Sequence, residues 1–545
     1  MQNDNEKSKK NHWLLGIILL ASFLLMVFSA ASDSMVVDEK VHIPAGYLHV
    51  WQGNYLFNSE HPPLLNDLAG LFAQIARPNV PEIPEDFTGG DQWEYGDLFF
   101  YESGNNLDEI LLWARLPFIL LSLALIYLTF VWAKTLFGPK AGLMAATLAA
   151  FSPNILAHGR LATTDSGLVF FFVLACFLLW KYLQKPNYLL ASLLGLAAGL
   201  TILSKFSGLI ILPIMIIGLL SFWLSRKIKF SSAVRQGLLI FIIPLVLSWA
   251  VYVFSMRSDL APTSTYVTSR TLGSQVISSD FSKWLIAPLD KYFQGMEILA
   301  DHNTGGHWAY LNGEVGYTGW WQYFPLVLWY KMTLAELILL FLGIFAFFRF
   351  KERRLDDFWV IFPPLLFLAI SITGKIDIGI RHILPILPFF YIFISRLVKN
   401  QNLIFRNVFL ILALAQIIIG ILAFPNYIAY FNQLAGGGKS GIRHLADSNL
   451  DWHQNMKRFG KYAKKNNIKK VYELCWDSAS FTYQGIESEI LPNTPVNGAV
   501  VICAQQLKVT PEGFEIGWVT KYPPDDIVAN AMYVWRFDLK PMELR

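Results

Sequence analysis

Two adjacent acidic residues, Asp38 and Glu39, follow the first apolar stretch of the chain, on the side away from the N-terminal lysines. The segment Glu60-His61-Pro62-Pro63-Leu64 comes later in the same loop. A carboxylate within hydrogen-bond reach of a hydroxyl can take its proton and so activate the oxygen for attack. Adjacent acids after a membrane span are also commonly a solvated cap. The pair therefore predicts acid–base chemistry only together with other evidence.

Basic residues recur at the ends of several apolar stretches, on the same side of the membrane as these acids. Charged groups at membrane level are costly, so those that are retained are functional candidates. Arg160, Lys205 and Arg381 could bind an anion such as a lipid phosphate, with Asp165 and His382 nearby. Structural alternatives also exist. Asp165 could cap a helix N-terminus, Lys205 could extend to the membrane interface, and Arg381 could be an interfacial anchor.

Three histidines of the first outer loop could form a metal site with Asp38. His42, His49 and His61 are close in sequence, but their spacing matches no tight ligand pattern. We therefore expect a site that requires no cofactor, and a divalent metal is not favoured.

The composition is that of a membrane protein with many spans. Of 545 residues, 54% are hydrophobic and 15% charged, and the mean hydropathy is +0.41, which is too apolar for a soluble multidomain protein. Most apolar runs approach the length of about 20 residues that crosses a bilayer. We expect about eleven spans, at 13–31, 112–133, 141–157, 166–180, 188–204, 207–224, 237–256, 332–348, 358–372, 383–395 and 407–424.

The orientation follows from the basic residues, because short cytoplasmic loops are enriched in lysine and arginine. They cluster at 7–10, 134–140, 181–185, 226–235, 349–354 and 396–406, before the first span and then after alternate spans. This pattern predicts a multi-pass protein of the cell (inner) membrane, surrounded by membrane lipids, with a cytoplasmic N-terminus and an outer C-terminus. The net charge of +4 reflects this topology and does not indicate nucleic-acid binding.

Two domains are expected. Residues 1–424 form the transmembrane domain, with long outer loops at 32–108 and 257–323, and residues 425–545 form a soluble extracytoplasmic α/β domain. Segments 470–476 and 500–504 have the branched and aromatic content of buried strands. Cys475 and Cys503 in this domain could pair in an oxidising compartment, or could be two buried small residues.

Taken together, these segments resemble the dolichyl-phosphate-mannose protein mannosyltransferases, a family of C-type membrane glycosyltransferases that use polyprenyl-phosphate sugars. The matching order is more specific than any single motif. The motifs are Asp38-Glu39 with Gly46-Tyr47, Glu60-His61-Pro62-Pro63-Leu64, Thr164-Asp165, Gly319-Trp320-Trp321-Gln322-Tyr323-Phe324-Pro325 with Lys331, and Gly379-Ile380-Arg381-His382-Ile383-Leu384-Pro385. Bacterial members also carry the patterns seen here at 425–432, 436–438 and 447–452.

The resemblance implies a fold, a reaction and a set of roles. The fold is a polytopic α-helical membrane domain of the C-type glycosyltransferase class. The reaction moves a sugar, a hexose such as mannose, from a polyprenyl-phosphate donor to an acceptor hydroxyl on the outer face, with inversion. We expect Asp38 to be the base, with support from Glu39. The donor phosphate is expected to contact Arg381, Lys205 and Arg160, and substrate binding is expected of Glu60, His61, Asp165 and His382.

The acceptor stays open, as a protein Ser/Thr hydroxyl, a lipid or a glycan. This chain lacks the soluble insert that eukaryotic protein mannosyltransferases carry in the 257–323 loop, and it has His453 where many bacterial relatives have glycine. Aminoarabinose transferases that modify lipid A share the same membrane plan, so hexosyl and pentosyl transfer both remain open.

A transporter of a small anionic or lipid-linked solute is the alternative function. Transporters commonly bind at the membrane midplane, between broken helices related by an internal repeat. Here the charges lie at outer span ends, and the sequence shows neither an internal repeat nor a pair of broken helices. The enzyme is therefore the favoured interpretation.

Overall fold

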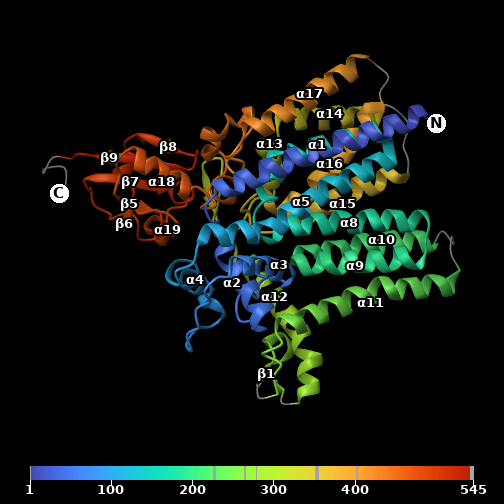
Figure 1. The fold of residues 1–545 in the computed structure, drawn as a ribbon, viewed down its shortest axis with the longest axis horizontal. Coiled ribbons are helices and arrows are strands. Elements are labelled where there is room, and N and C mark those ends of the chain that lie inside the picture. Colours follow the sequence, from blue (N-terminus) through green and yellow to red (C-terminus); the bar gives the residue numbers. More distant parts are fainter. Residues whose placement is uncertain are drawn as a thin grey trace.

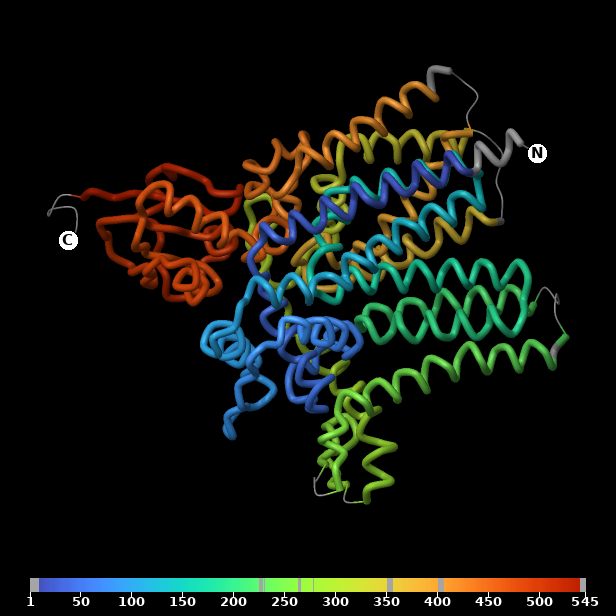
Figure 2. The backbone as a smooth tube through the Cα atoms, viewed as in Figure 1, coloured from blue at the N-terminus to red at the C-terminus, as the bar shows by residue number. Residues whose placement is uncertain are grey.

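A bundle of long helices carries a small sheet domain at one end (Figure 1). The computed structural model describes residues 2–224, 229–262, 266–277, 279–349, 355–399 and 403–539. The predicted basic segments at 226–228 and 351–354 lie outside these residues. The N-terminal end of the chain and the sheet lie at opposite ends of the bundle, as the backbone tube also shows (Figure 2).

Six helical segments of the described chain are long and apolar enough to cross a membrane, or seven if one bent pair counts as a span. Three further apolar helices are shorter. The predicted count of about eleven spans therefore stays a prediction. The helices of the bundle include α1 (Gln2–Ser32), α5 (Leu107–Phe137), α8 (Thr164–Gln184), α9 (Tyr188–Ser204), α10 (Ile211–Leu224), α11 (Phe230–Ser255), α14 (Leu334–Arg349), α15 (Leu355–Ser371), α16 (Leu387–Ser395) and α17 (Leu403–Leu422).

One expected span is interrupted in the structure, and a second, 332–348, follows a bent helix that was not expected. The run 141–157 divides into α6 (Pro139–Ala150) and α7 (Pro153–His158), because Pro153 begins a new helix after Ser152. Helices α13 (Tyr323–Lys331) and α14 are bent by 115° at a short break, which the sequence did not indicate. The break lies after Lys331, a buried lysine whose Nζ donates to the carbonyls of Ile428 and Asn449 at 2.6 Å each.

The outer loops lie at the end of the bundle that carries the sheet domain, beside that domain (Figure 1). The first contributes α2 (Glu39–Tyr47), α3 (Leu64–Ala73) and α4 (Gln92–Asp97). Gly46 and Gly70 let α2 and α3 approach so closely that a Cβ on either would meet backbone atoms within 2.1 Å. The second loop contributes α12 (Asp280–Gly305) and the short strands β1 (Tyr266–Val267), β2 (Val276–Ile277), β3 (Ala309–Leu311) and β4 (Glu314–Gly316).

The C-terminal part forms a five-stranded mixed sheet in the order β6-β5-β7-β9-β8. Strand β5 is parallel to β6 and β7, and β9 is antiparallel to β7 and β8. Cys475 and Cys503 form a disulfide between neighbouring strand ends. The elements are α18 (Met456–Lys465), β5 (Lys470–Leu474), α19 (Ala479–Tyr483), β6 (Glu487–Ile490), β7 (Gly498–Cys503), α20 (Ala504–Lys508), α21 (Gly517–Thr520), β8 (Asp526–Val528) and β9 (Met532–Phe537).

The segment that joins the bundle to the sheet domain packs against the helices. Tyr427, Ile428 and Trp452 share a buried apolar cluster with Met26 of α1 and Ile119 of α5. The predicted domain boundary at 425 stays a prediction, but the segment after it is part of the surface that closes the outer end of the bundle.

Candidate active site

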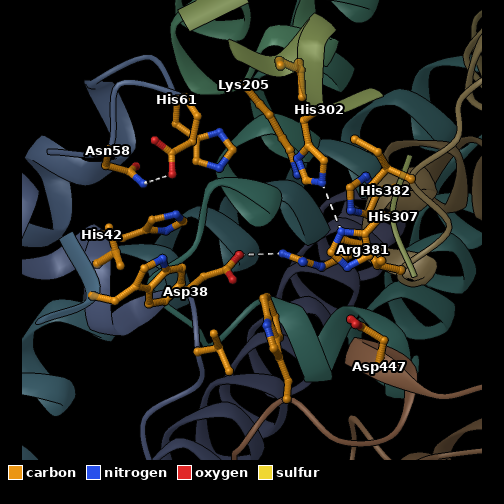
Figure 3. A pocket seen from close by; sticks show the side chains of 18 of the residues that line it. Asp38, His42, Asn58, His61, Lys205, His302, His307, Arg381, His382 and Asp447 are labelled. Carbon is orange, nitrogen blue, oxygen red and sulfur yellow. Dashed lines mark hydrogen bonds and ion pairs between the residues drawn. The ribbon is translucent and has the colours of Figure 1, made fainter. Parts of the chain in front are cut away.

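A cavity of about 320 Å³ lies where the first outer loop, α12, the start of the α16 span and the C-terminal segment meet (Figure 3). This volume is at the lower end of the range for small-molecule sites. The residues of chemical interest that line it are Asp38, His42, Asn58, Glu60, His61, Trp93, Lys205, His302, His307, Arg381, His382, Asp447, Asp451, Trp452 and Trp476.

Asp38 and Arg381 meet in this cavity. Asp38 stands at the N-terminal end of α2, and its Oδ2 accepts from Arg381 Nη1 at 2.6 Å. The Asp38 side chain remains 20% exposed. Burial raises the pKa of Asp38, but the positive charge of Arg381 outweighs it and holds that pKa below the ordinary aspartate value. Asp38 is therefore ionised at neutral pH.

The approach of Arg381 depends on Gly379. Gly379 has a φ of +148°, and a Cβ there would meet Ser448 Oγ at 2.4 Å. Ser448 Oγ in turn accepts from Arg381 Nε at 3.1 Å. The guanidinium also stacks over the Trp452 ring at 4.1 Å, a cation–π contact that restrains its plane.

Lys205 and Asp165 form a second ion pair beside the first. Asp165 lies in the first turn of α8, and Lys205 follows the last residue of α9. The Lys205 Nζ to Asp165 Oδ1 distance is 2.7 Å, and Asp165 Oδ2 lies 3.8 Å from Arg381 Nη1. The N-cap of α8 is Thr163. The carboxylate of Asp165 therefore faces the two cations, and Lys205 lines the cavity.

The length of α8 shows at which end of the bundle the cavity lies. Helix α8 has 21 residues and so is about 31 Å long, close to the thickness of a bilayer core. Asp165 is at its cavity end and Lys181 at its other end. Lys181 thus lies about a full span away from the cavity end of α8.

Glu60 and His61 also line the cavity. Glu60 Oε1 accepts from Gln92 Nε2 at 2.8 Å and from Asn58 Nδ2 at 3.2 Å. The rings of His61 and His42 pack edge to face, with centroids 5.3 Å apart. Burial lowers the pKa of both histidines, so both are neutral at pH 7 and can accept or donate a hydrogen bond. His382 lines the same cavity.

The structure does not bring Glu39 to the cavity. Its carboxylate forms a bidentate pair with Arg115 of α5, at 2.8 Å from Nε and 2.6 Å from Nη2, and also accepts from the Ala162 amide at 2.9 Å. Both side chains are almost fully buried. Glu39 therefore ties the first outer loop to α5 and to the loop before α8.

Arg160 is likewise directed elsewhere. It pairs with Asp33, which also pairs with Arg458 of the sheet domain, and it donates to the Leu156 carbonyl at 2.7 Å. This network joins the end of α1 to α7 and α18. Neither Arg160 nor Glu39 is among the residues that line the cavity.

We expect Glu39→Gln to lower stability while leaving the chemistry of folded molecules nearly unchanged. Removing one partner of a buried ion pair costs about 3–5 kcal/mol, because the other charge is left unpaired. Thermal unfolding in detergent measures the loss. Asp108→Asn is the matched control, since Asp108 pairs with Lys457 at 2.7 Å but is half exposed, where a pair contributes little. If Glu39→Gln lost sugar transfer but kept its stability, Glu39 would have a catalytic role.

Four of the lining acids and aromatics come from residues after 425, none of which was predicted as a site residue. Asp447, Asp451 and Trp452 belong to the pattern at 447–452, and Trp476 follows β5. Burial raises the pKa of Asp447 to about 6 and that of Asp451 to about 7. His453 has a φ of +72°, the left-handed region that favours glycine.

The second outer loop adds a histidine pair at the cavity. His302 of α12 and His307 lie 3.0 Å apart, from Nε2 to Nδ1. Among the described residues, no group of three or more His, Cys, Asp or Glu side chains is placed to hold a metal ion.

Residues 104–249 match the family model of dolichyl-phosphate-mannose-protein mannosyltransferases. The chain is mannosyltransferase-like in this segment. The match runs from the start of α5 into α11 and includes Asp165 and Lys205, whereas Asp38 and Arg381 lie outside it. The resemblance that the motifs indicate is thus confirmed. No curated protein matches this chain significantly.

Several solved structures of membrane glycosyltransferases are loosely similar to this chain. ArnT from Cupriavidus metallidurans, bound to undecaprenyl phosphate, is 12% identical, with a TM-score of 0.48, over 95% of this chain and 97% of that one. The Archaeoglobus fulgidus oligosaccharyltransferase is 11% identical, with a TM-score of 0.49, over 88% and 64%. The S. cerevisiae Pmt1-Pmt2 protein O-mannosyltransferase, bound to its sugar donor, is 18% identical, with a TM-score of 0.34, over 46% and 34%.

Proposed function

We propose that the protein is an inverting membrane glycosyltransferase that moves a sugar from a polyprenyl-phosphate donor to an acceptor hydroxyl at the outer membrane face. The observation that carries the proposal is that Asp38 shares one cavity with Arg381 and Lys205. A base and two phosphate-binding cations are the groups this reaction needs. Transfer of radiolabel from a polyprenyl-phosphate sugar to an acceptor tests it.

In the proposed reaction, the acceptor oxygen attacks the anomeric carbon while its proton passes to Asp38. The bond between the anomeric carbon and the phosphate oxygen breaks, and its electron pair leaves with the polyprenyl phosphate. A phosphate monoester has a second pKa near about 6, so it can leave without a general acid. Arg381 and Lys205 stabilise the charge that develops on it. No metal or cofactor takes part in these steps.

The resting pair between Asp38 and Arg381 suggests how the base is prepared. In the free enzyme, Arg381 holds the pKa of Asp38 low, which makes Asp38 a weak base. A donor phosphate competes for the same guanidinium, which binds phosphate well because its donors form a planar fork. Once Arg381 shares its charge with the phosphate, the pKa of Asp38 rises and the carboxylate becomes a stronger base.

We therefore expect two different acid limbs in the pH dependence of transfer. The limb of kcat/KM reports the free enzyme and lies below the ordinary aspartate pKa, because Arg381 stabilises ionised Asp38. The limb of kcat reports the bound enzyme and lies at higher pH. Activity falls below each limb as Asp38 becomes protonated. Steady-state kinetics from pH 3 to 8 measure both limbs, and coincident limbs would contradict this role of the ion pair.

The family description supports a hexose such as mannose as the sugar that we propose. A protein Ser/Thr hydroxyl, a lipid and a glycan all present the hydroxyl that the reaction needs. We further propose that the cavity and the C-terminal domain face the extracytoplasmic side, which is supported by the basic residues at the far end of α8.

A further inference from the structure

One wall of the cavity, the 447–452 wall, is fastened directly to Arg381. Ser448 Oγ accepts from Arg381 Nε at 3.1 Å and donates to the Ile378 carbonyl. Asn449 Oδ1 accepts from the Ile380 amide at 3.0 Å. The C-terminal segment is thereby held beside the guanidinium, so a group attached to a phosphate on Arg381 would meet this wall first.

Asp451 presents an unpaired carboxylate oxygen in this wall. The residue is 2% exposed, and its Oδ1 accepts from the His453 amide at 3.2 Å. Its Oδ2 is buried and has no hydrogen-bond partner among the described residues. The nearby Ala504 amide donates instead to the Ala531 carbonyl at 2.8 Å. A buried polar oxygen without a partner is costly, and a ligand hydroxyl in the cavity would satisfy it.

Asp447 stands beside it in a backbone conformation that few side chains adopt. Its φ is +56°, and its amide donates to Gln505 Oε1 at 2.7 Å. Among the described residues, neither Asp447 nor Asp451 has a basic partner within ion-pair distance. The cations of the cavity are already paired with Asp38 and Asp165, so these two acids are not needed to balance charge.

The aromatic side chains around these acids complete a surface suited to a sugar. Trp452, Trp476 and Trp93 line the same cavity. A pyranose presents an apolar C–H face, which packs on an aromatic ring, and a rim of hydroxyls, which donate to carboxylates. An anionic ligand would be repelled by the acids, which separates this wall from the phosphate site at Arg381 and Lys205.

We propose that Asp447 and Asp451 accept hydrogen bonds from hydroxyls of the donor's sugar, and that the 447–452 wall is the sugar subsite of the cavity. This inference rests on the proposed function, because it places the sugar next to a donor phosphate on Arg381. In this arrangement the C-terminal segment selects the sugar, and the first outer loop supplies the base.

The test compares a bare lipid phosphate with sugar-linked lipid phosphates on purified full-length protein in nanodiscs. Affinity is measured for bare undecaprenyl phosphate and for undecaprenyl phosphate carrying mannose, glucose or galactose. The sugar-linked lipid that binds most tightly is then used with Asp451→Asn and Asp447→Asn, which keep the shape of each side chain. We expect each variant to lose about 10- to 100-fold in affinity for that lipid, the range for a hydrogen bond to a charged group, and to bind the bare lipid as the wild type does.

Each other outcome has a distinct meaning. Glu473→Gln is the control, because Glu473 is a buried acid of the same domain that does not line the cavity, and it should leave both affinities unchanged. Equal losses for both lipids would overturn the inference, since the acids would then only shape the cavity. A wild type that binds bare lipid as tightly as every sugar-linked lipid would also overturn it. A wild type that binds neither lipid would contradict the proposed function itself.

Discussion

Asp38→Asn is expected to reduce sugar transfer by about 100- to 10,000-fold, the contribution typical of a positioned general base. Asparagine keeps the shape of the side chain and can still accept from Arg381 through its amide oxygen, so the cavity should persist. The amide cannot take the proton of the acceptor hydroxyl. Initial rates with a radiolabelled polyprenyl-phosphate sugar measure the loss, and donor affinity should be retained.

The control for this substitution is Asp97→Asn. Asp97 belongs to the same outer loop and pairs with Lys40 at 2.5 Å, but it does not line the cavity. Its amide variant should transfer sugar within about threefold of the wild type, as expected for a partly exposed pair. Full activity of Asp38→Asn in membranes that contain normal amounts of the protein would remove Asp38 as the base.

Arg381→Ala is expected to lower kcat/KM for the donor by about 100- to 1,000-fold, the cost of removing one preorganised donor from a developing anion. Lysine at this position should restore only part of the rate, because it lacks the planar fork that binds phosphate. KM for the acceptor should change little. Because Asp38 loses its ion-pair partner, its pKa should rise, and the acid limb of kcat/KM should move to higher pH.

Arg270→Ala serves as the matched control. Arg270 is an arginine of the second outer loop that pairs with Glu297 at 2.6 Å on an exposed surface, where a pair contributes little. Donor and acceptor kinetics should both stay close to wild type. A rise in acceptor KM with an unchanged donor KM in Arg381→Ala would place Arg381 on the acceptor side of the cavity.

Local patterns in the sequence were enough to predict the helical membrane domain and much of the site. Span-length apolar runs indicate the bundle, and the basic loops indicate which span ends share a side. That sidedness alone groups Asp38, Lys205 and Arg381, and the structure places all three at one cavity. The ion pair between Asp165 and Lys205 was not predicted, although the two residues lie at the same end of consecutive helices.

Side-chain direction could not be predicted in the same way. Asp38 and Glu39 are neighbours in sequence, but successive residues of a helical turn point about 100° apart. Asp38 therefore faces Arg381, while Glu39 faces Arg115, which lies 76 positions further along the chain. Arg160 is turned away from the cavity by Asp33 in the same manner. Such long-range ion pairs leave no local signal.

Local sequence patterns also could not predict that the C-terminal segment lines the cavity. Residues 447–452 follow the last helix of the bundle and were assigned to the outer domain, where nothing in their spacing indicates a return to the cavity. They return because Lys331 binds the carbonyls of Ile428 and Asn449 and because Trp452 packs among the helices. At the break between α13 and α14, the Thr333 amide donates to Glu336 Oε2 at 2.8 Å and the Glu336 amide donates to Thr333 Oγ1 at 3.0 Å, a local capping box that begins α14.

The most direct test of the central claim is to supply purified protein in vesicles with a radiolabelled polyprenyl-phosphate sugar and a membrane extract as the source of acceptors. We expect label to move covalently onto a protein, lipid or glycan acceptor, and to do so in the wild type but not in Asp38→Asn. Label that enters the vesicles without any covalent product would contradict the account and identify a transporter.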